Sequence, residues 1–224
     1  MAMLGALPMA VMTQRSRPDR ALAPALEALA ARDADIARHF AACGLPPARR
    51  QLKGFAGLLR IVVAQQVSAH AARAIIARLA AAARPLTPEA FLALDDEALR
   101  SIGLSRQKIR YGRALAEDVL AGRLNFRALG CMDDEAAIAH MVRAKGIGRW
   151  SAEIYLLFAL RRPDIWPADD LAVQVAAQRL KGLEARPARE NMIALAEPWR
   201  PHRSAAARFL WHIYRHPGVP DAPA

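Results

Sequence analysis

Two adjacent carboxylates, Asp169 and Asp170, stand between a proline and a new apolar helical pattern, in the sequence WPADDL over residues 166–171. One acid at such a place is explained by a helix N-cap, whose side chain accepts from the first free N–H groups. A second acid is not needed for capping. A carboxylate held in a cleft can act as a base or stabilise a developing positive charge, so this pair is a candidate for chemistry. A purely structural cap remains the alternative.

A possible anion site precedes this pair by about twenty residues. Gly146-Ile147-Gly148 lies between two helical patterns, where glycine permits a tight turn and close approach of another backbone. We expect the next helix to begin near Arg149 to Ser151, so that its free N–H groups can bind a phosphate beside the Arg149 charge. An ordinary turn between two helices is the simpler alternative.

The elements that position these residues are predicted to be helices. From about residue 24 onward, apolar residues recur at three- and four-residue spacing, and alternating β-branched runs are scarce. The fold class is therefore all-α. The expected breaks lie at residues 44–47, 84–88, 103, 122–125, 146–148 and 163–167.

Helix starts account for many of the acidic residues. Thr87 followed by Pro88 and Glu89 is typical of an N-terminus, and acids at residues 95–97 and 133–135 open two further helices. Acids used in this way leave the basic excess free. With 32 Lys plus Arg against 21 Asp plus Glu, the formal charge is +11 and favours a polyanionic partner, although biased composition alone could produce the same excess.

Length and cysteine usage limit the class of protein. The 224 residues suffice for one domain or two packed lobes, and we assign residues 1–24 to a flexible tail and residues 25–224 to the domain. Residues 1–12 are apolar but too short to span a membrane. Cys43 and Cys131 have no metal-ligand spacing, so no iron–sulfur cluster is expected, and a reducing cytoplasm is the natural setting.

Four segments together resemble a known family. The Gly-Ile-Gly hairpin followed by Trp150 and the PADDL segment resembles the helix-hairpin-helix DNA glycosylases, most closely the bacterial 3-methyladenine DNA glycosylase II type. Residues 61–68 (IVVAQQVS), 99–109 (LRSIGLSRQKI) and 197–214 (EPWRPHRSAAARFLWHIY) resemble the same family in the same order. The resemblance covers about residues 50 to 215.

This resemblance implies a fold and an activity. The fold is a two-lobed helical bundle with a DNA-binding cleft and a helix-hairpin-helix motif at about residues 141–160. The implied function is base excision repair, in which a monomeric, nucleoid-associated bacterial enzyme hydrolyses the N-glycosidic bond of alkylated bases such as 3-methyladenine in double-stranded DNA. By motif position Asp170 is the catalytic carboxylate, which stabilises an oxocarbenium-like transition state, and Asp169 is a local cap or support.

The resemblance also assigns the residues that hold the flipped base. Trp150 and Trp211 match the family's pocket aromatics, which favour a positively charged alkylated purine by stacking and cation–π attraction. Ile154 stands where the bacterial type often has a pocket tyrosine, and Tyr155 follows one residue later, so Tyr155 is the expected substitute. For each tryptophan alone, core packing is the alternative.

The remaining assignments concern DNA and an ion. Gln66 corresponds to the residue inserted into the stack at the vacated position, whereas Gly146, Gly148, Arg149 and Ser151 form the phosphate-binding turn. Arg203 and Ser204 are expected to orient the last helix. A sodium or potassium ion bound by the backbone carbonyls of Val142, Ala144 and Ile147 is implied, and no other cofactor is required.

Bifunctional relatives carry a nucleophilic lysine where this chain has Trp150, so no strand-cleaving lyase activity is expected. Other substrates remain open, namely uracil, hypoxanthine or a mismatched thymine. A non-catalytic helix-hairpin-helix DNA-binding protein is a further alternative, since such motifs also serve as phosphate grips. A helical protein-interaction bundle with a basic surface is the remaining one.

Overall fold

The computed structural model describes residues 17–49 and 52–216, and within these ranges the chain is all-helical, which confirms the predicted fold class. The only pairing of extended type among them is an isolated bridge between Pro18 and Pro47. The helices in chain order are η1 (Arg20–Leu22), α1 (Ala23–Ala30), α2 (Ala34–Cys43), α3 (Gly54–Ala64), α4 (Ala69–Ala82), α5 (Pro88–Leu92), α6 (Asp96–Ile102), α7 (Arg106–Leu120), η2 (Ala128–Cys131), α8 (Asp134–Val142), α9 (Arg149–Phe158), α10 (Leu171–Lys181), α11 (Arg189–Ala196), η3 (Glu197–Trp199) and α12 (Arg203–Tyr214).

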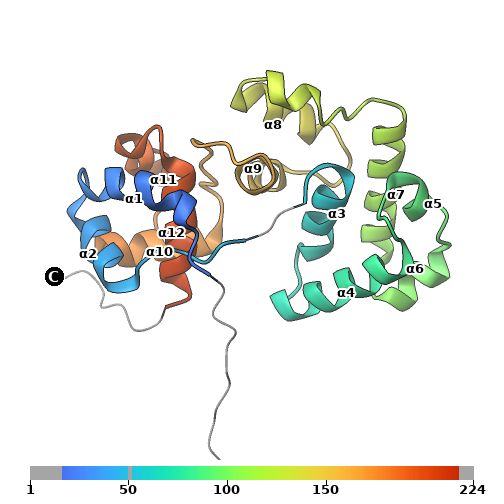
Figure 1. Ribbon diagram of the computed structural model, residues 1–224, viewed down its shortest axis with the longest axis horizontal. Coiled ribbons are helices and arrows are strands. Elements are labelled where there is room, and N and C mark those ends of the chain that lie inside the picture. The colour runs from blue at the N-terminus through green and yellow to red at the C-terminus, as the bar shows by residue number, and fades with distance from the viewer. Residues whose placement is uncertain (1–16, 50–51, 217–224) are drawn as a thin grey trace, which may run out of the picture.

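The helices form two lobes on either side of α9 (Figure 1). One lobe combines both ends of the chain, with α1 and α2 packed against α10 and α12. The other lobe is the continuous segment α3 to α7, in which α7 packs on α3 and α5. The helices α8 and α9 pack on each other, and α9 also packs on α3. The central α9 thus joins the two lobes.

The predicted helix starts are confirmed by their caps. The side chains of Thr87, Asp95 and Asp133 accept hydrogen bonds from the N–H groups three residues later, at distances of 3.2, 2.7 and 2.8 Å. Each such cap satisfies a donor that the helix itself cannot pair, and contributes about 1 kcal/mol. Local sequence therefore sets these helix boundaries without help from the tertiary fold.

Asp33 joins the two ends of the chain within the first lobe. It caps α2 and also accepts from Trp199 Nε1 at 2.8 Å and from the Lys181 ammonium at 2.7 Å. These bonds hold the pKa of the Asp33 carboxyl below its usual value, although partial burial opposes the shift. One carboxylate thus connects α2, the end of α10 and η3.

The start of α12 is fixed by two contacts with the loop before α10. Arg203 makes a two-pronged ion pair with Asp164, at 2.9 and 2.8 Å, and Ser204 Oγ accepts from the Ile165 N–H at 2.9 Å. Because both side chains are used in this way, the expectation that they orient the last helix is confirmed.

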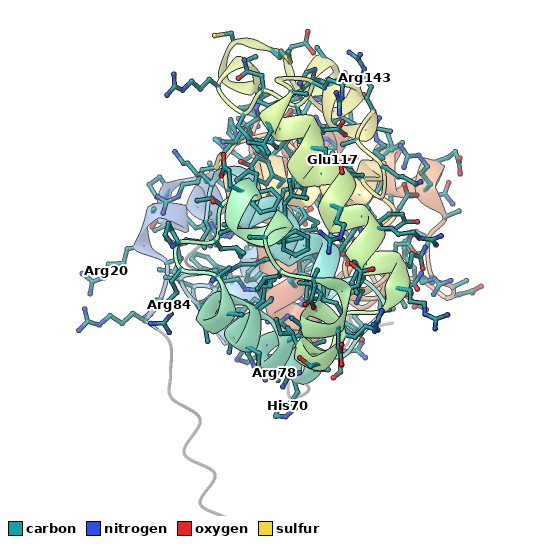
Figure 2. All side chains as sticks on the ribbon, turned by 90° about the vertical axis from the view of Figure 1, so that its right-hand side faces the viewer. Arg20, His70, Arg78, Arg84, Glu117 and Arg143 are labelled. Carbon is teal, nitrogen blue, oxygen red and sulfur yellow. The ribbon has the colours of Figure 1, made fainter. Side chains whose placement is uncertain are left out.

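The second lobe packs closely around α7. At Gly112 an added Cβ would lie 2.6 Å from the Phe91 ring, so only glycine allows α5 to approach α7 this closely. Arg113 then binds the carbonyl of Leu94 and the carboxylate of Asp96. Figure 2 faces this lobe and shows His70 of α4 at the bottom, while Arg143, which follows α8, lies near the top.

The first-lobe boundary differs from the sequence prediction. Residues 17–24, which we had assigned to a flexible tail, contain η1 and the start of α1, and Asp19 caps η1 and pairs with Arg208 of α12 at 2.5 Å. The sequence does not indicate that residues 17–24 are ordered, because Asp19 pairs with Arg208, which lies far along the chain. Residues 1–16 of the predicted tail lie outside the described residues. In the described part, no helix is long and apolar enough to cross a membrane.

Candidate active site and DNA interface

Asp170 is the N-cap of α10 and the meeting point of three helices. Its Oδ1 accepts from the Val173 N–H at 3.0 Å and from Trp211 Nε1 of α12 at 3.0 Å. Its Oδ2 accepts from Trp150 Nε1 of α9 at 2.8 Å. Only 8% of the residue is exposed. Three N–H donors therefore fix the direction of a carboxylate that still keeps an edge open to solvent.

The two tryptophans predicted beside Asp170 are therefore brought to it, although they lie in different parts of the chain. Trp211 stacks on Phe158, with ring centroids 5.3 Å apart and an angle of 28° between the planes. Trp150 is half-buried, whereas Trp211 is 8% exposed. Phe158 was not predicted beside the site, because the sequence of a buried helix does not show which aromatic ring its last residue contacts.

The two adjacent acids have separate roles. Asp169 is exposed and pairs with Arg189 at the start of α11. Of the two roles expected for Asp169, a local cap or a support, the cap falls to Asp170 itself, which begins α10. Asp169 is a supporting group through its ion pair with Arg189. The hydrogen bond of a capping carboxylate fixes its side-chain orientation. The same fixed orientation directs the second oxygen of Asp170 toward a ligand.

The glycine turn between α8 and α9 is built as predicted, with one difference. Gly146 has a φ of +86°, and an added Cβ would lie 2.4 Å from Cγ of Tyr111. The close approach is thus to an aromatic ring of α7, and not to another backbone. At Gly148 an added Cβ meets nothing within 4 Å, so that position faces open space.

The start of α9 is equipped to bind an anion. Gly148 is the N-cap and has no side chain, and among the described residues no acceptor takes the N–H groups of Arg149, Trp150 or Ser151. Unpaired N–H groups at a helix start carry the positive end of the helix dipole. These free N–H groups are compatible with a bound phosphate, and the phosphate contact itself stays a prediction.

The side chains of Arg149 and Ser151 make contacts within the protein. Arg149 makes a two-pronged ion pair with Glu135 of α8, at 2.5 and 2.9 Å, and a third contact of 2.9 Å with Glu153. Ser151 is buried, and its hydroxyl accepts from Gln65 Nε2 at 2.9 Å, so Ser151 can offer DNA only its backbone N–H. The Arg149 side chain stays partly exposed beside the free N–H groups. The part of both residues in the phosphate-binding turn stays a prediction.

The two glutamines after α3 have different environments. Gln65 donates to the Gly146 carbonyl at 3.2 Å and to Ser151, and so ties the second lobe to the hairpin. Gln66 is exposed and has a φ of +55°, a backbone conformation that residues other than glycine rarely adopt. The strained backbone projects Gln66 away from the protein, in keeping with the predicted wedge. Gln66 was predicted from the sequence, whereas the contact made by Gln65 was not.

Tyr155 is not available to a base. It is fully buried, its hydroxyl accepts from the Gly54 N–H at 2.7 Å, and its ring packs against Phe126 at 5.5 Å. The prediction that Tyr155 replaces a pocket tyrosine is wrong. The 100° rotation between successive helix positions turns it toward α3, while Ile154, also buried, takes the previous position.

The expected ion ligands are backbone carbonyls around the same turn. Among the described residues no donor reaches the carbonyls of Val142 or Ile147, and the Ala144 carbonyl accepts only from the Ile147 N–H at 3.1 Å. Oxygen atoms with free lone pairs suit a sodium or potassium ion. The residues present therefore fit the implied group.

Comparison with known proteins places this site in a family. The model of the HhH-GPD superfamily of base excision DNA repair proteins matches residues 59–201. DNA-3-methyladenine glycosylase 1 of Schizosaccharomyces pombe is 34% identical over 158 residues, which is 69% of each chain. The putative DNA-3-methyladenine glycosylase YfjP of Bacillus subtilis is 32% identical, and the match covers 55% of this chain and 43% of that protein.

Comparison with solved structures leads to the same family. The S. pombe 3-methyladenine DNA glycosylase Mag1 in complex with abasic DNA superposes with a TM-score of 0.77 at 30% identity, covering 84% of this chain and 95% of that one. A DNA-3-methyladenine glycosidase from Bacillus halodurans gives 0.74 at 30% identity, with 86% and 89% covered. The fold is that of the helix-hairpin-helix base excision enzymes. The chain belongs to the HhH-GPD superfamily.

The two hairpin glycines are expected to respond differently to alanine. Gly146→Ala destabilises the protein by about 1 to 3 kcal/mol, because its methyl overlaps the Tyr111 ring and its positive φ is strained. Gly148→Ala leaves stability nearly unchanged but weakens duplex DNA binding several-fold, because its methyl occupies open space beside the free N–H groups. Urea unfolding and fluorescence anisotropy with a duplex measure the two effects. Unchanged DNA affinity in Gly148→Ala would argue against phosphate binding there.

The buried Glu153 is expected to make stability depend on pH. It is 1% exposed, its Oε2 has no partner, and burial raises its pKa to about 7 despite the opposing Arg149. The folded state therefore keeps a proton that the unfolded chain releases above its ordinary value of 4.5, so wild-type stability falls as pH rises from 5 to about 7. Glu153→Gln removes this loss.

Urea unfolding at pH 5 and pH 8 measures the effect. The stability of Glu153→Gln relative to wild type should rise by on the order of 2 kcal/mol between these pH values. Glu135→Gln is the matched control, because Glu135 shares Arg149 but has a lowered pKa and stays ionised across the window. Equal pH dependence in the wild type and both variants would show that Glu153 is already charged at pH 5.

Proposed function

We propose that this protein is a monofunctional DNA glycosylase, which hydrolyses the N-glycosidic bond of alkylated bases such as 3-methyladenine in double-stranded DNA. The observation that carries the proposal is Asp170, a nearly buried carboxylate oriented by two indole N–H groups from two other helices. A phosphate grip without catalysis needs no such group. The names of the similar proteins support the same activity.

The chemistry follows from a carboxylate beside the sugar. A damaged base must leave the duplex before an enzyme can reach its glycosidic bond. As the bond from C1′ to the base breaks, positive charge develops on the sugar, and the Asp170 carboxylate stabilises it. The electron pair of the broken bond stays on the departing base, which as an N3-alkylated adenine leaves as a neutral molecule. Water then adds to C1′ and loses its proton to solvent. Because Oδ2 accepts one hydrogen bond from Trp150, it keeps lone-pair capacity for the sugar cation or for this water.

The hairpin would hold the DNA backbone near the flipped nucleotide. The free N–H groups at the start of α9 would donate hydrogen bonds to a phosphate, and the carbonyls of Val142, Ala144 and Ile147 would hold a monovalent cation that adds positive charge beside it. Gln66 would fill the space left by the base. Such backbone binding is salt-dependent and has little base preference.

The proposal includes the oligomeric state and the localisation of the protein. We propose a monomer acting on one lesion at a time, in the cytoplasm and associated with the bacterial nucleoid. The charge of +11 supports association with DNA.

The enzyme is expected to lack lyase activity. Trp150 donates to Asp170 at the position where bifunctional relatives carry a lysine, so no amine is placed to form a Schiff base. Borohydride treatment of wild-type protein with lesion-containing duplex should therefore give no covalent adduct, while base release proceeds. A trapped protein–DNA species in wild type that is lost with Lys145→Arg would contradict this expectation.

Asp170→Asn should abolish base release while retaining DNA binding. Asparagine keeps the shape and the capping oxygen but loses the negative charge, so release of alkylated base should fall at least about a hundredfold. Single-turnover release and anisotropy on the same duplex give the two readouts. Asp169→Asn is the matched control, since it removes a neighbouring charge that touches only Arg189, and its release rate should remain close to wild type.

A further inference from the structure

Lys108 of α7 is a half-buried cation whose partner is a backbone carbonyl. Its ammonium donates to the carbonyl of Val63 at 2.7 Å, 45 residues back along the chain. Partial burial lowers the pKa of this ammonium, and no carboxylate within residues 17–49 and 52–216 pairs with it. A cation that is partly removed from water needs another source of negative charge.

The carbonyl that Lys108 binds belongs to the last turn of α3. Val63 directly precedes Ala64, where α3 ends, and the carbonyls of a last helical turn have no partner within the helix. In the described part of the chain no backbone N–H donates to the Val63 carbonyl. The end of a helix also carries the negative pole of its dipole, which attracts a cation. Lys108 therefore supplies both the donor and the charge that this end of α3 lacks.

The turn that follows α3 carries the predicted wedge. Gln66 is exposed and has a φ of +55°. A strained backbone of this kind persists only where the surrounding contacts fix it. On one side of the turn, Gln65 donates to the Gly146 carbonyl and to the Ser151 hydroxyl. On the other side, Lys108 fixes the last turn of α3, so the strained residue lies between two anchors.

The same face of α7 also supports the hairpin. Tyr111 follows Lys108 by three residues, so the two side chains are neighbours on the surface of α7. The Tyr111 ring lies directly against Gly146, where an added Cβ would come within 2.4 Å of Cγ. One face of α7 thus supports both of the exposed turns that are predicted to contact DNA.

We propose that Lys108 is a positioning residue, which holds the turn of Gln66 in the strained conformation that keeps a damaged base out of the duplex. The inference rests on the glycosylase function proposed above. An extruded base leaves a gap in the stack, and a side chain that fills this gap opposes its return. Lys108 acts through Gln66 and not on the glycosidic bond. It therefore increases the fraction of lesions that are extruded and leaves the cleavage step itself unchanged.

Single-turnover release of 7-methylguanine from two duplexes tests this role. In one duplex the lesion pairs with cytosine, and in the other it lies opposite an abasic-site analogue, where extrusion breaks no base pair and costs less. Lys108→Met removes the ammonium and should slow release at least about tenfold from the paired duplex, but less than about threefold from the unpaired one. Lys108→Arg still donates N–H groups and should restore the paired rate to within about threefold of wild type.

Two further variants separate positioning from other roles. Gln66→Ala removes the wedge and should show the same selective loss, and adding Lys108→Met to it should slow release little further, because both changes affect one element. Arg110→Met removes an exposed charge of α7 about 200° round the helix from Lys108, so the ratio of the two rates should stay as in wild type. Thermal melting establishes that each variant folds. Lys108→Gln, with the same selective loss expected, replaces Lys108→Met if that variant is unfolded.

Each result supports or overturns one proposal. An equal loss on both duplexes in Lys108→Met, or no loss on the paired one, overturns the positioning role and leaves Lys108 a support of the fold. Independent losses in the double variant, or no selective loss in Gln66→Ala, also overturn it, because Lys108 then does not act through Gln66. If wild type binds both duplexes but releases no base from either, the glycosylase function itself fails, and the inference with it.

Discussion

The two indole hydrogen bonds to Asp170 are the contacts on which the arrangement of this protein depends. They join α9, which carries the hairpin, to α10 and α12, which belong to the other side of the molecule. A carboxylate removed from water must be hydrogen-bonded to remain stable. The cap of α10 and the two tryptophans satisfy that need and, by the same contacts, aim the carboxylate. Stability and the orientation needed for catalysis thus have one physical origin.

The central helix explains how the hairpin and the carboxylate keep their relative positions. Residues 151–158 of α9 are all buried, so the helix is enclosed by both lobes and cannot shift without disturbing each core. Gln65 ties the hairpin to α3, and Arg149 ties α9 to α8. The groups that this helix start exposes are backbone groups, namely its free N–H groups. Rigid support therefore lies directly beneath the surface that would bind DNA.

The distribution of charge separates structural arginines from free ones. Arg203 and Arg149 are paired with carboxylates and hold helices together, so they contribute little to the field outside. Arg49 lies near Arg208 and Arg215, and no carboxylate within residues 17–49 and 52–216 pairs with it. A net charge of +11 therefore describes the attraction to a polyanion only in general terms. Which cations act on a ligand depends on which acids the fold brings beside them.

The sequence by itself determined the helices, their caps and their breaks, because periodicity and capping are local properties of the chain. Resemblance to the family selected Asp170, Trp150 and Trp211, and the fold brings these three side chains together. Only the tertiary structure decided that Tyr155 is fully buried and that the partly exposed Arg149 side chain pairs with Glu135 of α8 and Glu153 of α9. Burial and ion pairing depend on partners many residues away. One step along a helix turns a side chain by 100°, which separates a pocket wall from a core, and only packing shows which of the two it is.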